Sequence, residues 1–266
     1  MDGEWALVLF TVLSQMAVGT FLLLSVFLLL ADREIDSTGR RVLLATGIVL
    51  TAALLSSIFH LKSPLNAYKM LNSLETSWLS REILALLLFV GAGVFFALIE
   101  FLKIGSLRTR ALVASTAALM GVGLIFSMAK VYMLRTVPAW DSWLTVATFF
   151  STALLLGSVT LGVAYRKDAP LLKRLAVIAI VIVVARILLA AATSSAAGWE
   201  VPEGLKQRVE PERWLIVFQG ALLLLGGACL GAVRFKKRAP ALLVQGAFLS
   251  LTVSELLGRF LFYACQ

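Results

Sequence analysis

Eight apolar runs, each about as long as a bilayer is thick, constrain this chain more than any other feature. A helix needs about 20 mostly apolar residues to cross about 30 Å of hydrocarbon, and it satisfies its own backbone hydrogen bonds there. The sequence therefore predicts an all-α polytopic membrane protein with eight transmembrane helices and one domain over residues 1–266. The expected helices cover residues 5–30, 42–59, 82–102, 111–134, 143–165, 175–197, 213–233 and 241–263.

The composition agrees with this class, because 60% of the residues are hydrophobic and only 15% are charged. The longest links, 61–81 and 198–212, leave little room for a further domain. The N-terminal "MDGEW" is acidic, which is not typical of a cleaved signal peptide, so the first helix is expected to stay. Cys229 and Cys265 have no CxxC spacing and indicate neither a disulfide framework nor an iron–sulfur site.

The net charge of +9 could suggest nucleic-acid binding, but the basic residues are concentrated in the links between the apolar runs, which indicates membrane topology. More than half of the 24 Lys and Arg residues lie in the links that follow the odd-numbered runs, at 33–41, 103–110, 166–174 and 234–238. Because basic residues are retained on the cytoplasmic side, this distribution predicts that both termini lie outside. The expected partner of the charged surface is the lipid bilayer, and no nucleic acid is expected.

Ionisable residues within the apolar runs indicate a site, because each costs about 2.5–3.5 kcal/mol to insert. With both termini outside, six such groups from four helices fall in the outer half of the membrane. They are His60, Glu82, Lys130, Tyr132, Glu255 and Arg259. Their common depth predicts a polar pocket at the outer face.

Each of these residues also has a purely structural interpretation. Ser80 resembles a helix N-cap, with Glu82 as an acid in the first turn, and His60 would cap the end of its helix. Glu255 and Arg259 stand four residues apart and would neutralise each other. Arg186 lies mid-run with no acid evident at its depth, so we expect it to line a polar cavity or to meet a backbone carbonyl.

The link between the second and third runs carries a helical pattern of its own. Ser63-Pro64 resembles a cap followed by a first-turn proline, and apolar residues recur at helical spacing after it. This predicts a short amphipathic helix in the outer interface, anchored by Tyr68 and Trp78, that covers the pocket. The alternative is that the segment only spaces the two spans.

The residue inventory limits the chemistry of the pocket. A haem held between helices needs two axial histidines, and the sequence has one, so no haem and no metal site is expected. A histidine, carboxylates, basic groups and tyrosines suit hydrogen bonding and proton transfer with a quinol head group. They equally suit a proton-coupled small-solute transporter, although all six prolines fall in links or at helix starts and no repeat is evident. A purely structural anchor is the other alternative.

Four blocks make the sequence resemble the membrane anchor subunit of dimethyl sulfoxide reductase-type molybdoenzymes, the eight-helix quinol-oxidising subunit of a three-subunit complex. The likeness runs along essentially the whole chain, and its most specific part is the second block. The blocks are "GEWALVLFTVLSQMAVGTFLLL", "HLKSPLNAYKMLNSLETSWLSREI", "VYMLRTVPAWDSW" and "SELLGRFLFYA".

The resemblance implies roles for particular residues. It associates His60 and Glu82 with menaquinol binding and oxidation near the outer face, and Glu255 with Arg259 matches the family's Glu-x-x-Gly-Arg. The third block implies outer-loop elements near the site or a partner subunit, at Thr136, Pro138 and Trp140. Lys62 departs from the family's small glycine, and Arg186 has no counterpart in the pattern.

The resemblance also implies a location, partners and a mechanism. The chain would be a multi-pass protein of the bacterial cytoplasmic (inner) membrane, with its quinol site and partner subunits on the periplasmic side. Menaquinol would be a bound substrate, oriented with the help of Arg259, Lys130 and Tyr132. Its electrons would pass to an iron–sulfur electron-transfer subunit and a molybdopterin catalytic subunit, because this chain is expected to hold no haem or iron–sulfur cluster.

Overall fold

All regular secondary structure in the described part of the chain is helical. The computed structural model describes residues 2–31, 34–60, 72–137, 140–195, 213–236 and 239–264. Within them lie α1 (Asp2–Ala31), α2 (Ser37–His60), α3 (Trp78–Phe101), α4 (Leu107–Tyr132), α5 (Trp143–Ala164), α6 (Ala169–Ser195), α8 (Arg213–Phe235) and α9 (Ala241–Ala264). The expected all-α class is confirmed, and each observed helix overlaps one of the expected apolar runs.

Seven of these helices are long and apolar enough to cross a membrane by length and composition. The remaining helix, α6, carries Lys173, Arg174 and Arg186 within its described part. Eight spans and the positions of the termini therefore stay predictions. The expected interfacial helix falls mainly on residues 61–71, which lie outside the described residues, and residues 72–76 form a short 3₁₀ segment and a turn.

The start of α3 differs from the expectation. Ser77, not Ser80, is the N-cap, because its side chain accepts a hydrogen bond from the Ser80 N–H at 3.4 Å. Trp78, expected in the interfacial helix, is the first residue of α3. The cap therefore lies three residues earlier than expected, and no acid occupies the first turn. Glu82 lies beyond the turn where a helix dipole stabilises negative charge, which argues against its interpretation as a helix-start acid.

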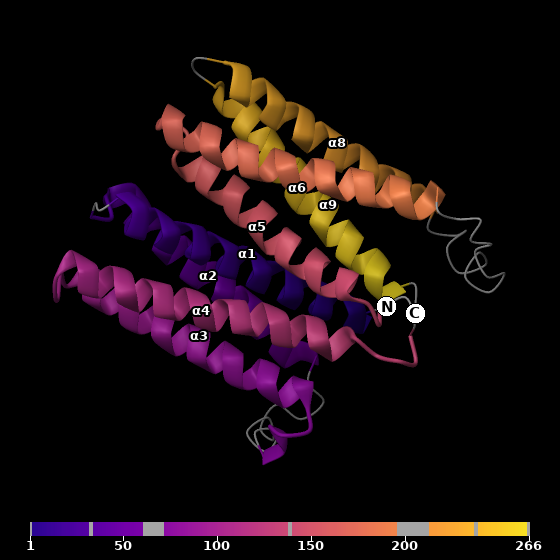
Figure 1. Cartoon of the computed structure of the whole chain (residues 1–266), viewed down its shortest axis with the longest axis horizontal. Coiled ribbons are helices and arrows are strands. Elements are labelled where there is room, and N and C mark those ends of the chain that lie inside the picture. Colours follow the sequence, from indigo (N-terminus) through magenta and orange to yellow (C-terminus); the bar gives the residue numbers. More distant parts are fainter. Residues whose placement is uncertain are drawn as a thin grey trace. The chain divides into compact units, whose positions relative to one another are not determined.

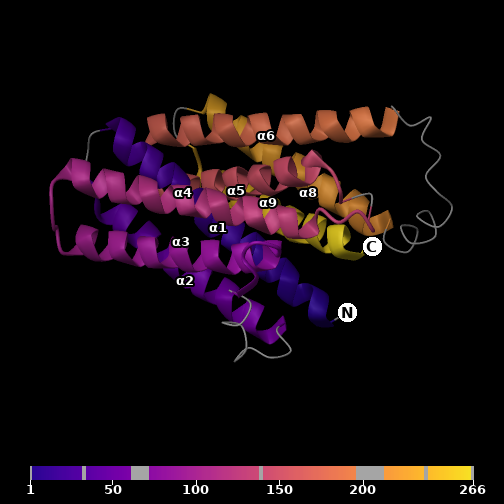
Figure 2. The ribbon, with the colours of Figure 1, turned by 60° about the horizontal axis from the view of Figure 1, so that its bottom comes forward.

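The protein divides into two compact units, Leu9–Gly157 and Met1–Val8 with Ser158–Gln266. In the first unit α3 packs along α4, as Figures 1 and 2 show. In the second unit α8 packs along α9 and α6 packs against α8 (Figure 1). The single domain expected from the sequence remains a prediction.

Small residues set the closest helix contact in the Leu9–Gly157 unit. A Cβ atom built on Gly19 of α1 would lie 1.8 Å from the backbone oxygen of Ala153 in α5. One built on Gly157 would lie 2.4 Å from the carbonyl carbon of Gly19. The two backbones therefore touch without intervening side chains, as helices in membranes commonly do where small residues face each other.

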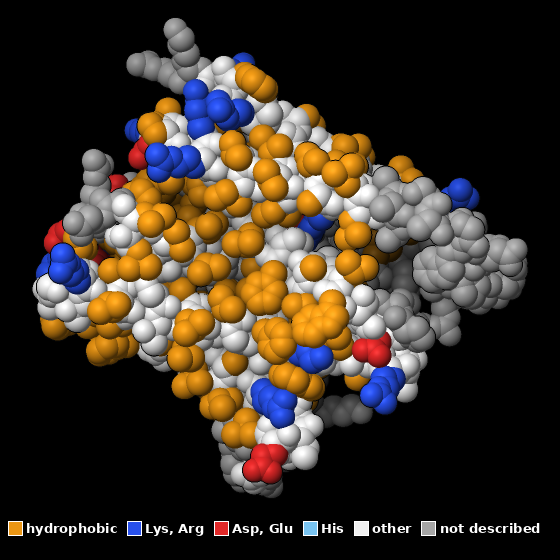
Figure 3. Space-filling model, viewed as in Figure 1, with side chains coloured by type: hydrophobic (Ala, Val, Ile, Leu, Met, Phe, Trp, Pro, Cys, Tyr) orange, Lys and Arg blue, Asp and Glu red, His pale blue; other side chains and the backbone are white. Residues whose placement is uncertain are grey.

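Aromatic side chains fill the space between α1 and α3. Phe21 meets the rings of Phe89 and Phe96 of α3 edge-on, with centroids 5.8 and 5.6 Å apart. Apolar side chains also cover much of the face seen in Figure 3. Large apolar residues are widely exposed, and Leu242 is 79% exposed. Apolar side chains on both the inside and the outside of the helices are expected when the outer surface contacts lipid rather than water.

Candidate functional site

Glu82 is the buried carboxylate on α3 that the described structure leaves without a partner. Only 5% of the residue is exposed, and no described residue forms a hydrogen bond or ion pair with it. Burying an unpaired carboxylate is costly, so such a group either stays neutral or serves a bound molecule. Glu82 is the fifth residue of α3, and its expected place in the outer half of the membrane stays a prediction.

Lys130 lies at the end of α4 between two indole rings. Its Nζ atom is 5.5 Å from the ring centre of Trp78 and 5.4 Å from that of Trp143. Both rings also contact Phe126, with centroids 5.8 and 6.5 Å away. An ammonium over an aromatic face is attracted to the ring quadrupole, so the two tryptophans hold this cation in place. Sequence reasoning named Lys130 but missed Trp143, whose signal is only its position at a helix start.

The contact between Lys130 and Trp78 brings the end of α4 to the start of α3. Trp78 lies one helical turn before Glu82, so the predicted residues of α3 and α4 occupy the same end of this helix pair. Arg81 also fixes this end, because its guanidinium donates to the backbone oxygens of Leu74 at 2.8 Å and Glu75 at 2.6 Å.

Tyr132, the last residue of α4, packs against aromatic side chains from the following segment. Its ring centre is 5.7 Å from that of Trp140 and 5.8 Å from that of Phe149. Trp140 is buried, and its expected place near the site or a partner subunit stays a prediction. Pro138 lies outside the described residues.

The side chain of His60, and the whole of Lys62 and Tyr68, lie outside the described residues. His60 is the last residue of α2, so its backbone position agrees with a helix end. The expected roles of these three residues stay predictions.

The predicted residues of α9 belong to the other unit, and there Glu255 meets Arg186. The Nη1 atom of Arg186 donates to Oε1 of Glu255, which is 5% exposed. The expectation that Arg186 has no acid at its depth was wrong, because it pairs with Glu255. The two residues are 69 positions apart in the sequence, so the pairing was not evident from the sequence. Arg259 is buried and its guanidinium lies 5.4 Å from the ring centre of Phe262.

A second polar contact is formed by Ser254, the residue before Glu255 in the sequence. The hydroxyl of Ser254 donates to the backbone oxygen of Gln219 at 3.0 Å, and the Gln219 amide reaches the same hydroxyl at 3.4 Å. The pair and this contact connect α6, α8 and α9 through polar groups in largely apolar helices. Hydrogen bonds of this kind between membrane helices contribute about 0.6–2 kcal/mol each.

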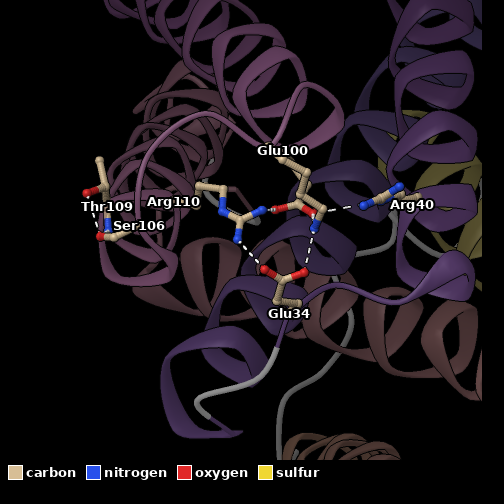
Figure 4. Close-up of polar contacts among 7 residues, drawn as sticks. Glu34, Arg40, Glu100, Ser106, Thr109 and Arg110 are labelled. Carbon is tan, nitrogen blue, oxygen red and sulfur yellow. Dashed lines mark hydrogen bonds and ion pairs between the residues drawn. The ribbon is translucent and has the colours of Figure 1, made fainter.

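A charged cluster that sequence reasoning missed joins the two links before α2 and before α4 (Figure 4). Its centre is Glu100, which is 1% exposed. Oxygens of Glu100 lie 2.8 Å from Lys103 Nζ, 3.2 Å from Arg110 Nη1 and 3.8 Å from Arg40 Nε. The available signal is an acid at the end of an apolar run followed by basic residues, a pattern that charge counting alone assigns to topology.

Glu34 completes the cluster from the link that follows α1. It accepts hydrogen bonds from Lys103 Nζ at 3.0 Å and from Arg110 Nη2 at 2.8 Å. These two hydrogen bonds lower the pKa of Glu34 below its ordinary value of 4.5. The cluster therefore ties the ends of α1, α2, α3 and α4 together at one end of the unit.

An apolar cavity of about 600 Å³ separates α2 from α3 in the same unit. Its walls run from Leu43 to Leu55 on α2 and from Phe89 to Phe101 on α3, with Phe21 of α1 also lining it. The cavity begins seven residues after Glu82, or about 10 Å along the helix. Among the described residues, no group of three His, Cys, Asp or Glu side chains could hold a metal ion.

Comparison with known proteins places these features in a family. The model of the DMSO reductase anchor subunit (DmsC) family matches residues 1–265. The C subunit of anaerobic dimethyl sulfoxide reductase from Escherichia coli is 31% identical over 98% of this chain and 94% of its own length. The YnfH subunit of an anaerobic dimethyl sulfoxide reductase from the same organism is also 31% identical, with the same coverage. The C subunit of the Haemophilus influenzae enzyme is 32% identical over 60% of this chain and 58% of its own length. The resemblance seen in the four sequence blocks is confirmed, and the protein belongs to the DMSO reductase anchor subunit family.

Proposed function

We propose that this protein is the menaquinol-oxidising anchor of a DMSO reductase-type complex in the bacterial inner membrane. The observation that carries the proposal is the buried carboxyl group of Glu82, which has no protein partner among the described residues. A quinol head group supplies the hydroxyl hydrogen that such a carboxylate accepts.

The proposed reaction begins when menaquinol enters from the lipid between α2 and α3. His60 hydrogen-bonds one head-group oxygen, and the Glu82 carboxylate takes a proton from the other hydroxyl. Menaquinol then becomes menaquinone by losing two protons and two electrons. The protons leave to the periplasm, and the electrons pass to an iron–sulfur cluster in a partner subunit and from there to a molybdopterin subunit.

Other residues orient the ring in this proposal. Lys130, fixed between two indoles, presents a positive charge near the proposed site, and Tyr132 lies at the end of the same helix. A cation there stabilises the negative charge that develops as the quinol loses its protons. The proposal also assigns quinol binding to three residues on the sequence pattern alone: Tyr68, Glu255 and Arg259.

The apolar cavity between α2 and α3 suits the isoprenoid tail of the same molecule. It is large enough for several isoprene units, and its walls are almost entirely aliphatic and aromatic. A tail that lies along this cavity places the head group toward the ends of the helices that carry His60 and Glu82. This support is independent of the charge of Glu82.

The proposal also includes the arrangement in the membrane. Eight spans, with α6 among them, place both termini and the quinol site on the periplasmic side, beneath a short interfacial helix that precedes α3. The electron-transfer and catalytic subunits dock on that side. This arrangement rests on the distribution of Lys and Arg among the links.

The test is quinol oxidation by membranes that contain the complex with Glu82→Gln. Loss of a general base typically lowers a rate about 10²–10⁴-fold, so we expect oxidation of a menaquinol analogue to fall at least about 100-fold. His60→Ala should lower the rate as well. Glu75→Gln is the matched control, because Glu75 is an exposed acid just before α3.

Measuring the assembly of the complex distinguishes a loss of quinol chemistry from a loss of membrane attachment. The reductase subunits should stay bound to membranes that carry Glu82→Gln and should still reduce substrate with an artificial electron donor. Wild-type quinol oxidation by Glu82→Gln would refute the assignment of Glu82. Equal losses in Glu82→Gln and Glu75→Gln would also contradict it.

A further inference from the structure

A second pocket, in the unit that contains α6, α8 and α9, is surrounded by cations. It has a volume of about 360 Å³ and lies where α5 ends, α6 begins and α8 ends. Four basic side chains line it, together with the apolar Leu172 and Val233: Arg166, Lys167, Lys173 and Lys236. Figure 3 shows Lys and Arg gathered over the end of the unit where α6 begins and α8 ends.

None of the four cations has a protein partner in the part of the chain that the structure describes. No ion pair or hydrogen bond there involves their side chains. The adjacent acid, Asp168, does not line the pocket, and its Oδ1 accepts the backbone N–H of Leu171 at 3.1 Å as a cap of α6. The pocket therefore concentrates like charges that repel one another until an anion binds.

The cluster around Glu100 in the other unit is the informative contrast. There the basic residues Arg40, Lys103 and Arg110 form ion pairs with two carboxylates of the same protein. The pocket in the α6, α8 and α9 unit has four basic side chains, and among the described residues no carboxylate forms an ion pair with them; the nearby Asp168 caps α6. Within the described residues these four cations therefore face no paired carboxylate, which suits them to an external anion.

The depth of the pocket indicates the kind of anion. The apolar helices α5 and α8 end at Ala164 and Phe235, and the basic residues Arg166 and Lys236 follow these ends by one or two positions. A helix of more than about 20 residues is longer than the hydrocarbon is thick, so its ends reach the head-group region when it spans the bilayer. That is the level of lipid phosphates. Leu172 and Val233 add an apolar wall on which the first carbons of an acyl chain pack.

We propose that this pocket binds the phosphate group of an anionic phospholipid. Arg166 presents a fork of N–H donors that fits two phosphate oxygens, and the three lysines supply compact charges around it. Basic pockets between membrane helices are known to hold acidic head groups by this chemistry. The site is separate from the proposed quinol chemistry and does not depend on it.

Native mass spectrometry of the full-length protein, purified with the subunits that accompany it, tests the proposal. The probe is mixed micelles with equal amounts of phosphatidylglycerol and phosphatidylcholine. The wild type should retain phosphatidylglycerol preferentially. Each basic residue near the surface strengthens anionic-lipid binding about fivefold, so replacing all four lining residues by Gln should reduce the preference on the order of 100-fold or more.

The matched control changes four other exposed basic residues to Gln: Arg41, Arg108, Arg174 and Arg234. It removes the same charge without touching the pocket and should keep the preference. Equal loss in both variants, or no loss in the pocket variant, would overturn the proposal. If the fourfold variant does not fold, Lys236→Glu, a change at one exposed residue, should by itself lower the preference, and an unchanged preference would overturn the proposal.

A competition experiment with inorganic phosphate distinguishes a phospholipid from a free phosphate ion as the ligand of the pocket. Millimolar inorganic phosphate, added to the wild type in neutral detergent, should not displace bound phosphatidylglycerol, because it lacks the acyl chains that pack on the apolar wall. Complete displacement by phosphate alone would assign the pocket to a soluble phosphate and contradict the lipid assignment.

Discussion

Two buried carboxylates on α3 show how the same residue type serves opposite purposes. Glu100 is surrounded by three basic groups, whereas Glu82 has no partner among the described residues. A paired buried charge belongs to the architecture, because its removal leaves the partners uncompensated. An unpaired one costs free energy on folding, which is why we assign Glu82 to the proposed quinol site.

This difference predicts opposite stability effects along one helix. Glu100→Gln should lower the free energy of unfolding by about 1.5–3 kcal/mol, because the buried Arg110 loses one of its two carboxylate partners and keeps only the exposed Glu34. Glu82→Gln should change it by less than about 1 kcal/mol, since no described contact is lost. Thermal unfolding of both purified variants in one detergent checks this, and a larger loss for Glu82→Gln would reverse the assigned roles.

The pKa of Glu34 predicts a pH dependence of stability. Its value in the folded protein lies below 4.5 because of the hydrogen bonds from Lys103 and Arg110, so its contribution is full above pH 4.5 and disappears as the pH falls through the lower folded value. The difference in unfolding temperature between wild type and Glu34→Gln should therefore be constant near neutral pH and shrink in acid. A difference that grew on acidification would have the wrong sign.

The pair formed by Arg186 and Glu255 predicts strong coupling between α6 and α9. Removing either charge deprives the other of this buried ion pair, so the double variant should lose less stability than the sum of the losses in Arg186→Met and Glu255→Gln. A double-mutant cycle measured by denaturation should give a coupling energy above about 1 kcal/mol. Additive effects would show that the two side chains act independently.

At the scale of elements, contact between helix backbones depends on glycine. Gly19→Ala would place a methyl group 1.8 Å from the backbone oxygen of Ala153, and a backbone atom has no rotamer by which to move aside. We expect this change to cost more than the about 1–3 kcal/mol typical of overpacking and to reduce the yield of folded protein. Gly123→Ala is the control, because nothing lies within 4 Å of its added Cβ, and it should be neutral or mildly stabilising.

At the scale of the whole molecule, the membrane status of α6 decides where the C-terminus lies. Eight spans put both termini on the same side, whereas the seven helices that satisfy length and composition alone would put them on opposite sides. We expect alkaline phosphatase fused after Gln266 to be active and green fluorescent protein at the same position to be dark. If the phosphatase fusion were inactive and the fluorescent fusion bright while the N-terminus lay outside, the number of spans would be odd and α6 would not cross the membrane.

The helices, and the positions of the polar groups along them, were predictable from the sequence alone. Apolar runs of span length specify helices because lipid offers the backbone no hydrogen-bond partners, and residue number along such a helix measures depth. The positions of Glu82, Lys130 and Tyr132 near helix ends followed from this, and only helix boundaries, such as the cap at Ser77, shifted by a few residues.

Tertiary structure alone decided which polar groups meet. Depth says nothing about the direction a side chain takes around its helix, so the pairing of Arg186 with Glu255, the three cations around Glu100 and the indoles beside Lys130 were not predictable. Most of these partners lie on different helices, and their contacts depend on how the helices rotate and pack. The same packing distinguishes basic residues that serve the protein's own carboxylates from those left to an external anion.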